Sequence, residues 1–206
     1  MLADHSVREL LAAFSSSDPT PGGGSAAALA SALGASLLMM VAGLPKTRNG
    51  SDADRAALTH ASGALTAIRR QLTEGIDTDT AAYDQVVAAY KLPKASADEQ
   101  SARKAAIQAA LRAATDVPLG VLRLSAEALE VSAAIAAHGH KAAASDVGVA
   151  VALLRAGARG AQLNVEINIG SVSDAEYASG VAAETAALSA AATDSADATD
   201  AQLRQV

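Results

Sequence analysis

The chain has 206 residues, of which half are hydrophobic but only 2% are aromatic, and it carries a formal net charge of −6. The acidic balance excludes a basic nucleic-acid-binding surface. Cysteine is absent, which excludes disulfides, thiolate catalysis and zinc sites built on sulfur, and the four histidines show no ligand spacing, so we expect no metal site.

The composition predicts a single domain over residues 1–206, because no shift in residue usage marks a boundary. With so few aromatic residues, burial must come from Ala, Leu, Val and Ile on closely packed helices. Such a core buries little area per residue in a monomer, so we expect a homodimer or a larger oligomer to supply part of it. The apolar stretch 29–44 is rich in Ala, Gly and Ser, which favours a buried helix over a membrane span. We therefore expect a soluble cytoplasmic protein with no membrane or nucleic-acid partner.

The first two helices are separated by a loop rich in proline and glycine. Apolar residues at helical spacing predict a short helix from Val7 to Phe14. A loop follows from Ser15 to Gly24. Ser25 is predicted to cap a second helix that reaches about Leu44 and is closed by Pro45.

Four further helices are predicted after a polar turn at residues 46–52. Capping boxes at 96–99 and 173–176 mark two of their starts, and Pro118 predicts a kink. No segment shows strand-like alternation, so the predicted fold is all-α, a multihelical bundle of long antiparallel helices. The predicted spans are about 52–90, with candidate bends at Gly63 and Gly75, then 97–137, 145–169, and 173 to near the C-terminus.

The segment Pro19-Thr20-Pro21-Gly22-Gly23-Gly24-Ser25 contains residues that a helix interior does not tolerate. It places bare backbone at a helix N-terminus, where unpaired N–H groups suit an anionic or carbonyl oxygen. It is no Walker loop, since the Gly-Lys-Ser/Thr ending is missing. Alternatively, the glycines only allow close helix packing and Ser25 only caps.

Asp79 lies within an apolar stripe of the long third helix, between Ile76 and Tyr83. Burial raises the pKa of a carboxyl group, which would let Asp79 act as a general acid near neutral pH. The alternative is a structural acid that binds a backbone group or a cation. Asp77 points to another face, where we expect it to be solvated or to have a supporting role.

Asn164 and Asn168 lie one turn apart on the fifth helix and could together bind an amide-like edge of a ligand. Asparagines also join helices without any ligand. Ser145 and Asp146 share this helix, but Asp146 is about 27 Å from Asn164 by helix rise. N-capping is the alternative role for the Ser-Asp pair.

Basic residues flank several helix ends and could attract an acidic substrate, although such charges are commonly only solvated. They are Lys46, Arg48, Lys91 and Lys94.

Six segments in register resemble the cyclodeaminase/cyclohydrolase family of folate enzymes over about 150 residues. They are 19–25, Asp77-Thr-Asp79-Thr-Ala-Ala-Tyr83, 92–94, 117–119, Ser145-Asp146-Val-Gly-Val-Ala and Asn164-Val-Glu-Ile-Asn168. The resemblance implies an all-helical homodimer, here in stand-alone form. It acts on one-carbon-substituted tetrahydrofolate as substrate, without a permanently bound cofactor.

The resemblance implies two reactions that meet at 5,10-methenyltetrahydrofolate. A cyclohydrolase hydrolyses this compound to 10-formyltetrahydrofolate. A cyclodeaminase forms it from 5-formiminotetrahydrofolate and releases ammonia. We place the cyclohydrolase first because nothing here resembles a fused formiminotransferase domain. A helical protein that only binds folate or a partner is the third hypothesis.

The resemblance also implies roles for the candidate residues. Asp79 or Asp77 is the expected acid/base, and Lys94 is expected to meet the glutamate tail of the folate. The other expected substrate-binding residues are Gly22, Gly23, Gly24, Ser25, Ser145, Asp146, Asn164 and Asn168. The chain departs from the family pattern at Pro45 to Gly50, where many relatives have Gly-Lys-Lys-Lys-Tyr, and at His140, where an asparagine is common.

Overall fold

The computed structural model describes residues 1–205, and within them the fold is all-α, as the sequence predicts. The described residues form no strand, only an isolated bridge between Thr47 and Gly139. The helices are η1 (Leu2–Asp4), α1 (Val7–Phe14), α2 (Gly23–Ala42), α3 (Asp52–Tyr90), α4 (Ala97–His138), η2 (Lys141–Ala143), α5 (Ala144–Ile169) and α6 (Ala175–Leu203).

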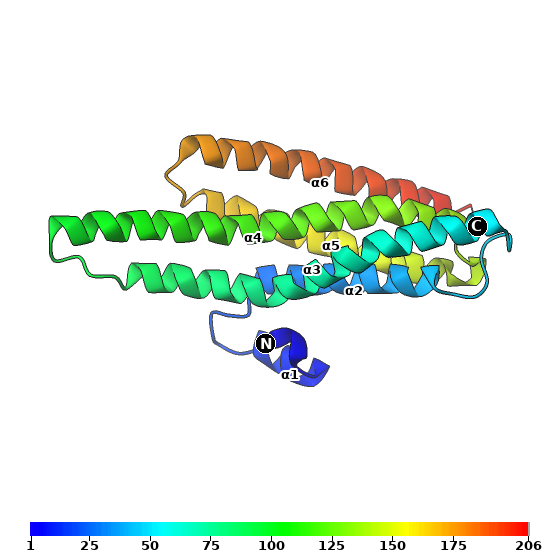
Figure 1. Ribbon diagram of the computed structural model, residues 1–206, viewed down its shortest axis with the longest axis horizontal. Helices are drawn as coiled ribbons and strands as arrows, with labels where there is room; N and C mark the ends of the chain where they lie inside the picture. The colour runs from blue at the N-terminus through cyan, green and yellow to red at the C-terminus, as the bar shows by residue number, and fades with distance from the viewer. Residues whose placement is uncertain (206) are drawn as a thin grey trace.

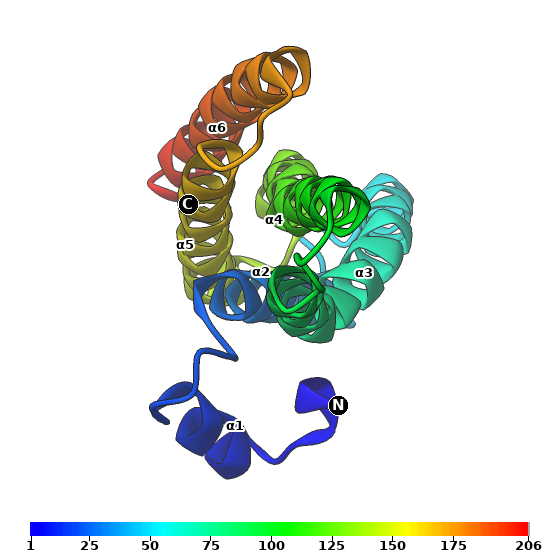
Figure 2. The same cartoon turned by 90° about the vertical axis from the view of Figure 1, so that its left-hand side faces the viewer.

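The five long helices form an elongated bundle (Figure 1). α3 and α4 form an antiparallel hairpin, α2 packs against α3, α4 and α5, and α6 covers α4 and α5. Seen along the bundle, α1 stands apart from the other α-helices, on the side of the bundle where α2 lies (Figure 2). The central position of α2 means that its two ends are surrounded by other elements.

Glycines bring α2 and α5 into close contact. A Cβ atom at Gly157 would lie 2.8 Å from the Ala27 carbonyl oxygen, and one at Gly34 would lie 2.8 Å from the Ala150 carbonyl oxygen. α2 is long and apolar enough to cross a membrane by length and composition, but 56% of its most apolar window is buried inside the bundle. This burial fits the predicted core helix.

Three predicted helix starts are wrong in detail. Gly22, and not Ser25, is the N-cap of α2, so Ser25 lies inside the first turn and is fully buried. α5 has Ala143 as its N-cap and no side-chain cap, so Ser145 and Asp146 do not cap it. α6 is capped by Asp174 alone, without a capping box. At α2 the difference has a physical reason, because the Ser25 hydroxyl donates to the Ile76 carbonyl on α3 instead of capping its own helix.

The capping box of Ser96 and Glu99 at the start of α4 is confirmed. The long helices α3 and α4 are each continuous. α3 passes through Gly63 and Gly75 without a break, and α4 keeps Pro118 in its interior. Neither glycine divides α3.

A hydrogen bond to a buried carboxyl group joins the end of α4 to the start of α3. Nδ1 of His138 lies 2.8 Å from Oδ1 of Asp54, which is 2% exposed. The backbone N–H of Asn49 donates to Asp54 Oδ2 at 2.7 Å. These hydrogen bonds hold the pKa of Asp54 well below its usual range, and the bond with His138 contributes most. The polar turn at 46–52 is thereby fastened to the bundle.

Candidate active site

A cavity of about 320 Å³ lies at the N-terminal end of α2, where the glycine loop meets three other helices. It draws residues from four separate parts of the chain. They are Pro19, Thr20, Gly22, Gly23 and Gly24 from the loop and α2, Asp79, Tyr83 and Val86 from α3, Leu111 and Ala114 from α4, and Asn164 and Asn168 from α5.

The carboxyl group of Asp79 is held by Ser25. The backbone N–H of Ser25 donates to Asp79 Oδ2 at 2.9 Å, and the Ser25 hydroxyl lies 3.1 Å from the same oxygen. That hydroxyl also donates to the Ile76 carbonyl at 2.8 Å. Burial raises the pKa of Asp79, and the bonds from Ser25 lower it in part, so that the pKa remains above the usual aspartate value. Burial therefore favours the protonated form of Asp79 more than it is favoured in an exposed aspartate.

The glycines allow neighbouring side chains to approach closely, and their backbone lines the cavity. A Cβ atom at Gly24 would collide with the Asp79 carboxyl group, and one at Gly23 would lie 3.3 Å from Asn164 Nδ2. At Gly22 a Cβ would meet only the Pro19 carbonyl oxygen, at 3.7 Å. Within residues 1–205 the N–H groups of Gly23 and Gly24 have no acceptor. The wall of the cavity therefore carries free donors at the positive end of the α2 dipole.

Both asparagines are fixed by carbonyl groups. Asn164 Nδ2 donates to the Gly160 carbonyl at 2.8 Å, within α5, and Asn168 Nδ2 donates to the Ala114 carbonyl on α4 at 2.9 Å. A carbonyl oxygen only accepts, so the NH₂ side of each amide is the one that it holds. Neither Oδ1 atom accepts a hydrogen bond within residues 1–205.

The structure separates Asp77 from Asp79. Asp77 accepts hydrogen bonds from the backbone N–H groups of Leu2 and Ala3 in η1 and does not line the cavity. It joins the N-terminal turn to α3, which is the supporting role that its face of the helix predicted. Asp79 is the carboxyl group that the cavity contains.

Four predicted substrate-binding residues do not line this cavity. Ser25 is fully buried, and its contact with the site is through Asp79. Lys94 is exposed in the turn between α3 and α4. Ser145 and Asp146 lie at the far end of α5, about 27 Å from Asn164 by helix rise. Beside them, a second hollow of about 450 Å³ is lined by residues of the 45–50 turn together with His140 and Lys141. The motif residues thus gather at two opposite ends of the bundle.

Leu111 and Ala114 were missed by the sequence analysis. They face Asp79 from α4, and their spacing carries no signal that would distinguish them from ordinary core residues. Tyr83 and Val86 follow Asp79 by one and two turns, so the apolar stripe already indicated that they share its face.

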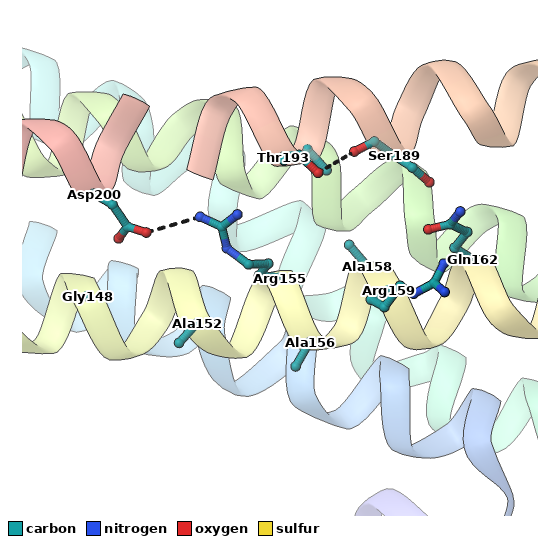
Figure 3. A pocket seen from close by; sticks show the side chains of 11 residues that line it. Gly148, Ala152, Arg155, Ala156, Ala158, Arg159, Gln162, Ser189, Thr193 and Asp200 are labelled. Atoms are coloured by element: carbon teal, nitrogen blue, oxygen red, sulfur yellow. Dashed lines mark hydrogen bonds and ion pairs between the residues drawn. The ribbon is translucent and has the colours of Figure 1, made fainter. Parts of the chain in front are cut away.

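A further cavity of about 530 Å³ lies between α5 and α6 (Figure 3). Its carboxyl group, Asp200, is paired with Arg155 at 3.0 Å, and Arg155 also binds Asp197 at 2.8 Å. Small side chains such as Ala152 and Ala156 form much of its wall. Because its carboxylate is paired with a cation, this cavity is a poorer acid/base site than the one around Asp79.

Comparison with known proteins agrees with this geometry. The profile of the formiminotransferase-cyclodeaminase family matches residues 6–187. The chain belongs to this family. The predicted resemblance is therefore confirmed, and it extends over most of the chain.

Relatives within the formiminotransferase-cyclodeaminase family carry two kinds of name. The chain is 39% identical over 178 residues to the methenyltetrahydrofolate cyclohydrolase of Methylorubrum extorquens, with 86% of each protein covered. It is 33% identical over 173 residues to the formimidoyltransferase-cyclodeaminase of Rattus norvegicus, which covers 84% of this chain. The chain spans only 32% of that longer protein.

A solved structure of the family has the same fold. The formiminotetrahydrofolate cyclodeaminase of Thermotoga maritima superimposes with a TM-score of 0.88 at 25% identity, covering all of this chain and 98% of the other. The names of these relatives identify enzymes, and two of them name a tetrahydrofolate derivative. Family membership thus supports a folate one-carbon enzyme.

Proposed function

We propose that this chain hydrolyses 5,10-methenyltetrahydrofolate to 10-formyltetrahydrofolate, with Asp79 as the general acid/base. The observation that carries the proposal is the buried Asp79 carboxyl group, which shares one cavity with the free N–H groups of Gly23 and Gly24. The 39% identity to a methenyltetrahydrofolate cyclohydrolase supports this activity over its alternative.

The reaction needs one group that first takes and then returns a proton. As a carboxylate, Asp79 accepts a proton from water while the water oxygen bonds to the methenyl carbon between N5 and N10. The tetrahedral carbon then breaks its bond to N5, and Asp79 returns the proton to N5. The formyl group stays on N10, and the second proton of the water is released to solvent. The raised pKa of Asp79 suits both steps.

The other residues of the cavity would bind and orient the substrate. The N–H groups of Gly23 and Gly24 would donate to a carbonyl oxygen of the substrate or to the oxygen on the tetrahedral carbon. The Oδ1 atoms of Asn164 and Asn168 would accept from N–H groups of the pterin ring. Ser25 would set the pKa of Asp79. Lys94, in the exposed turn beyond the cavity, would meet the glutamate tail.

The second candidate is the cyclodeaminase reaction, which the structural match to a formiminotetrahydrofolate cyclodeaminase favours. There N10 attacks the formimino carbon and loses its proton to the formimino nitrogen. Protonated Asp79 would give that nitrogen a second proton, so that it leaves as ammonia and the methenyl cation forms. A carboxyl group with a raised pKa is also suited to this role.

One absorbance experiment separates the candidates. Purified protein is mixed with 5,10-methenyltetrahydrofolate, and separately with 5-formiminotetrahydrofolate, and the methenyl chromophore is followed. Faster loss supports the cyclohydrolase, and gain from the formimino compound supports the cyclodeaminase. If neither changes while the protein is folded, both enzymatic proposals fail and a non-catalytic folate- or partner-binding role replaces them.

The proposal includes a cytoplasmic homodimer of one domain per chain, with no permanently bound cofactor or metal. The homodimer is supported by the apolar outer side of α2 and α5. Five large side chains there are between 42% and 74% exposed, namely Leu33, Met40, Val149, Leu163 and Ile167. On α5, Ala152 and Ala156 follow Val149 by three and seven residues, so helical spacing places these small side chains on the same side. Such a surface fits a second copy of the chain.

An antiparallel pairing of two copies along this side would also explain why the predicted substrate-binding residues lie at two opposite ends of the bundle. The cavity lies at the start of α2, whereas Ser145 and Asp146 lie near its end. In such a dimer, Ser145 and Asp146 of the partner subunit would approach the cavity that holds Asp79. The expected substrate-binding role of both residues would then be met across the interface.

A further inference from the structure

Pro118 lies inside α4 and leaves one carbonyl group of that helix without its usual partner. The helix is continuous from Ala97 to His138, and Pro118 is buried within it. Proline has no backbone N–H, so it cannot donate to the carbonyl four residues earlier. That carbonyl belongs to Ala114, which lines the Asp79 cavity.

Asn168 supplies the missing donor from another helix. Its Nδ2 atom donates to the Ala114 carbonyl at 2.9 Å, across 54 residues of sequence. An ordinary residue at position 118 would offer its own N–H to this carbonyl and compete with the asparagine. Asn164 differs, because its Nδ2 atom donates within its own helix, to the Gly160 carbonyl that is also the helical acceptor of the Asn164 backbone N–H.

We propose that Pro118 is a positioning residue for substrate binding, because it keeps the Ala114 carbonyl free to orient the amide of Asn168. Asn168 lines the cavity, and its NH₂ group is held by the Ala114 carbonyl. Its Oδ1 atom is then the acceptor that remains for a ligand. Asn168 then presents a hydrogen-bond acceptor of fixed direction to an N–H group of the bound folate. The inference rests on the proposed function and adds a specificity element to the same site.

The first test replaces Pro118 with residues that carry an N–H. Pro118→Ala restores the helical donor, and Pro118→Val does so with a bulkier side chain. Both variants are expected to raise KM for 5,10-methenyltetrahydrofolate about fivefold, the value of one hydrogen bond, and to keep kcat within about twofold. Circular dichroism is expected to show unchanged helical content. A residue that only packed would lower thermal stability and leave KM unchanged.

A matched control lies two residues further along the same helix. A Cβ atom at Gly120 would meet nothing within 4 Å, so Gly120→Ala changes helix propensity without touching the Ala114 carbonyl. Its KM is expected to equal that of the unchanged protein. A KM shift as large as that of Pro118→Ala would mean that altered helix stability, and not the freed carbonyl, causes the effect, and would overturn the proposal.

A double-mutant cycle with Asn168→Ala tests whether the two residues act together. If Pro118 works through Asn168, the double variant has the same KM as either single variant. If the two KM factors multiply, the residues act independently and the proposal fails. Turnover by the unchanged protein tests the proposed function separately. If the unchanged protein does not turn over 5,10-methenyltetrahydrofolate, the proposed function fails, whatever the Pro118 variants do.

A spectroscopic measurement needs no activity. In ¹⁵N-labelled protein the side-chain NH₂ signals of Asn168, assigned by their loss in Asn168→Ala, are expected to show slow exchange with solvent for the proton held by Ala114. In Pro118→Ala and Pro118→Val that protection is expected to be lost. Protection that persists in both variants would show that the carbonyl remains available without proline, and the inference would be wrong.

Discussion

The carboxyl group of Asp79 lies against the backbone of Gly24, in the space that the Cβ atom of any other residue would occupy. The next residue, Ser25, holds the same carboxyl group through its N–H and lies near it with its hydroxyl. The first turn of α2 is thus shaped around one carboxyl group of α3. The glycine run and the aspartate-rich segment, which are 54 residues apart, form one unit.

Gly24→Ala is expected to lower turnover by more than tenfold, because the methyl group displaces the carboxyl group on which the chemistry depends. The measurement is steady-state turnover of 5,10-methenyltetrahydrofolate. Gly22→Ala is expected to cost much less, since a Cβ there meets only one atom at 3.7 Å. Equal losses in both variants would contradict the assigned contact.

Asp79→Asn is expected to lower turnover by about 100-fold or more, the usual contribution of a general acid/base. Asp77→Asn is expected to have a much smaller effect on turnover, because Asp77 binds η1 outside the cavity. A full loss in Asp77→Asn with Asp79→Asn still active would reverse the assignment.

The same Asp79→Asn variant is expected to melt at a higher temperature near pH 7. Burial raises the folded-state pKa of Asp79 above its unfolded value. Its contribution to stability is therefore complete below the unfolded pKa and is lost as the pH rises through the folded pKa. Asparagine avoids the buried charge at neutral pH. The difference in melting temperature between the two proteins should shrink as the pH is lowered, and a difference that grows instead would refute this account.

Ser25→Ala is expected to move the pH profile of kcat/KM toward higher pH in the limb governed by Asp79. The Ser25 hydroxyl lowers the pKa of Asp79, so its removal lets the pKa rise further. A limb on which activity falls with decreasing pH indicates that Asp79 acts as a base, and one on which it falls with increasing pH indicates an acid. A shift to lower pH in either limb would show that Ser25 does not stabilise the carboxylate.

Gly157→Ala is expected to lower the free energy of unfolding by about 1–3 kcal/mol, a typical cost of overpacking. A Cβ atom there collides with the Ser31 side chain and approaches the Ala27 carbonyl at 2.8 Å. Gly63→Ala, where a Cβ meets nothing within 4 Å, is expected to stabilise by about 0.5–1 kcal/mol instead. Urea unfolding measures both, and a stable Gly157→Ala variant would contradict the close α2–α5 contact.

Leu163→Glu is expected to convert the proposed homodimer to a monomer, because a charge on the apolar side of α5 cannot be buried unpaired. Light scattering would then report 20.4 kDa, the mass of one chain, in place of about twice that value. Thr66→Glu, on the exposed side of α3, is the control and should leave the mass unchanged. A monomeric wild-type protein would refute the dimer, and a dimeric Leu163→Glu variant would exclude this surface as the interface.

Among residues 1–205 the approximate positions of the six α-helices were predictable because their signals are local, whereas the short helices η1 and η2 were not predicted. Apolar spacing marks Val7–Phe14, a capping box marks the start of α4, and proline after Tyr90 marks the end of α3. The role of Ser25 was not predictable. Its sequence context suits an N-cap, but a bond to Ile76 on another helix draws its hydroxyl into the core. A serine hydroxyl can cap its own helix or bond to a neighbouring helix, and the helix that packs beside it decides which of the two it does.

The sequence by itself determined the helices, the family and the residue types available for chemistry, since periodicity, capping and motif spacing are properties of neighbouring residues. Helical spacing already placed Asp79 in the apolar stripe and Asp77 on another face. Only the tertiary structure decided that a cavity forms at Asp79, that η1 binds Asp77, and that Ala114 offers its carbonyl to Asn168. The two aspartates are two residues apart on a helix, so they face different directions. The packing of α2 buries Asp79 beside glycine backbone, and the packing of η1 places the N-terminal turn against Asp77. Contacts across more than 50 residues depend on how helices pack, and no local pattern encodes that.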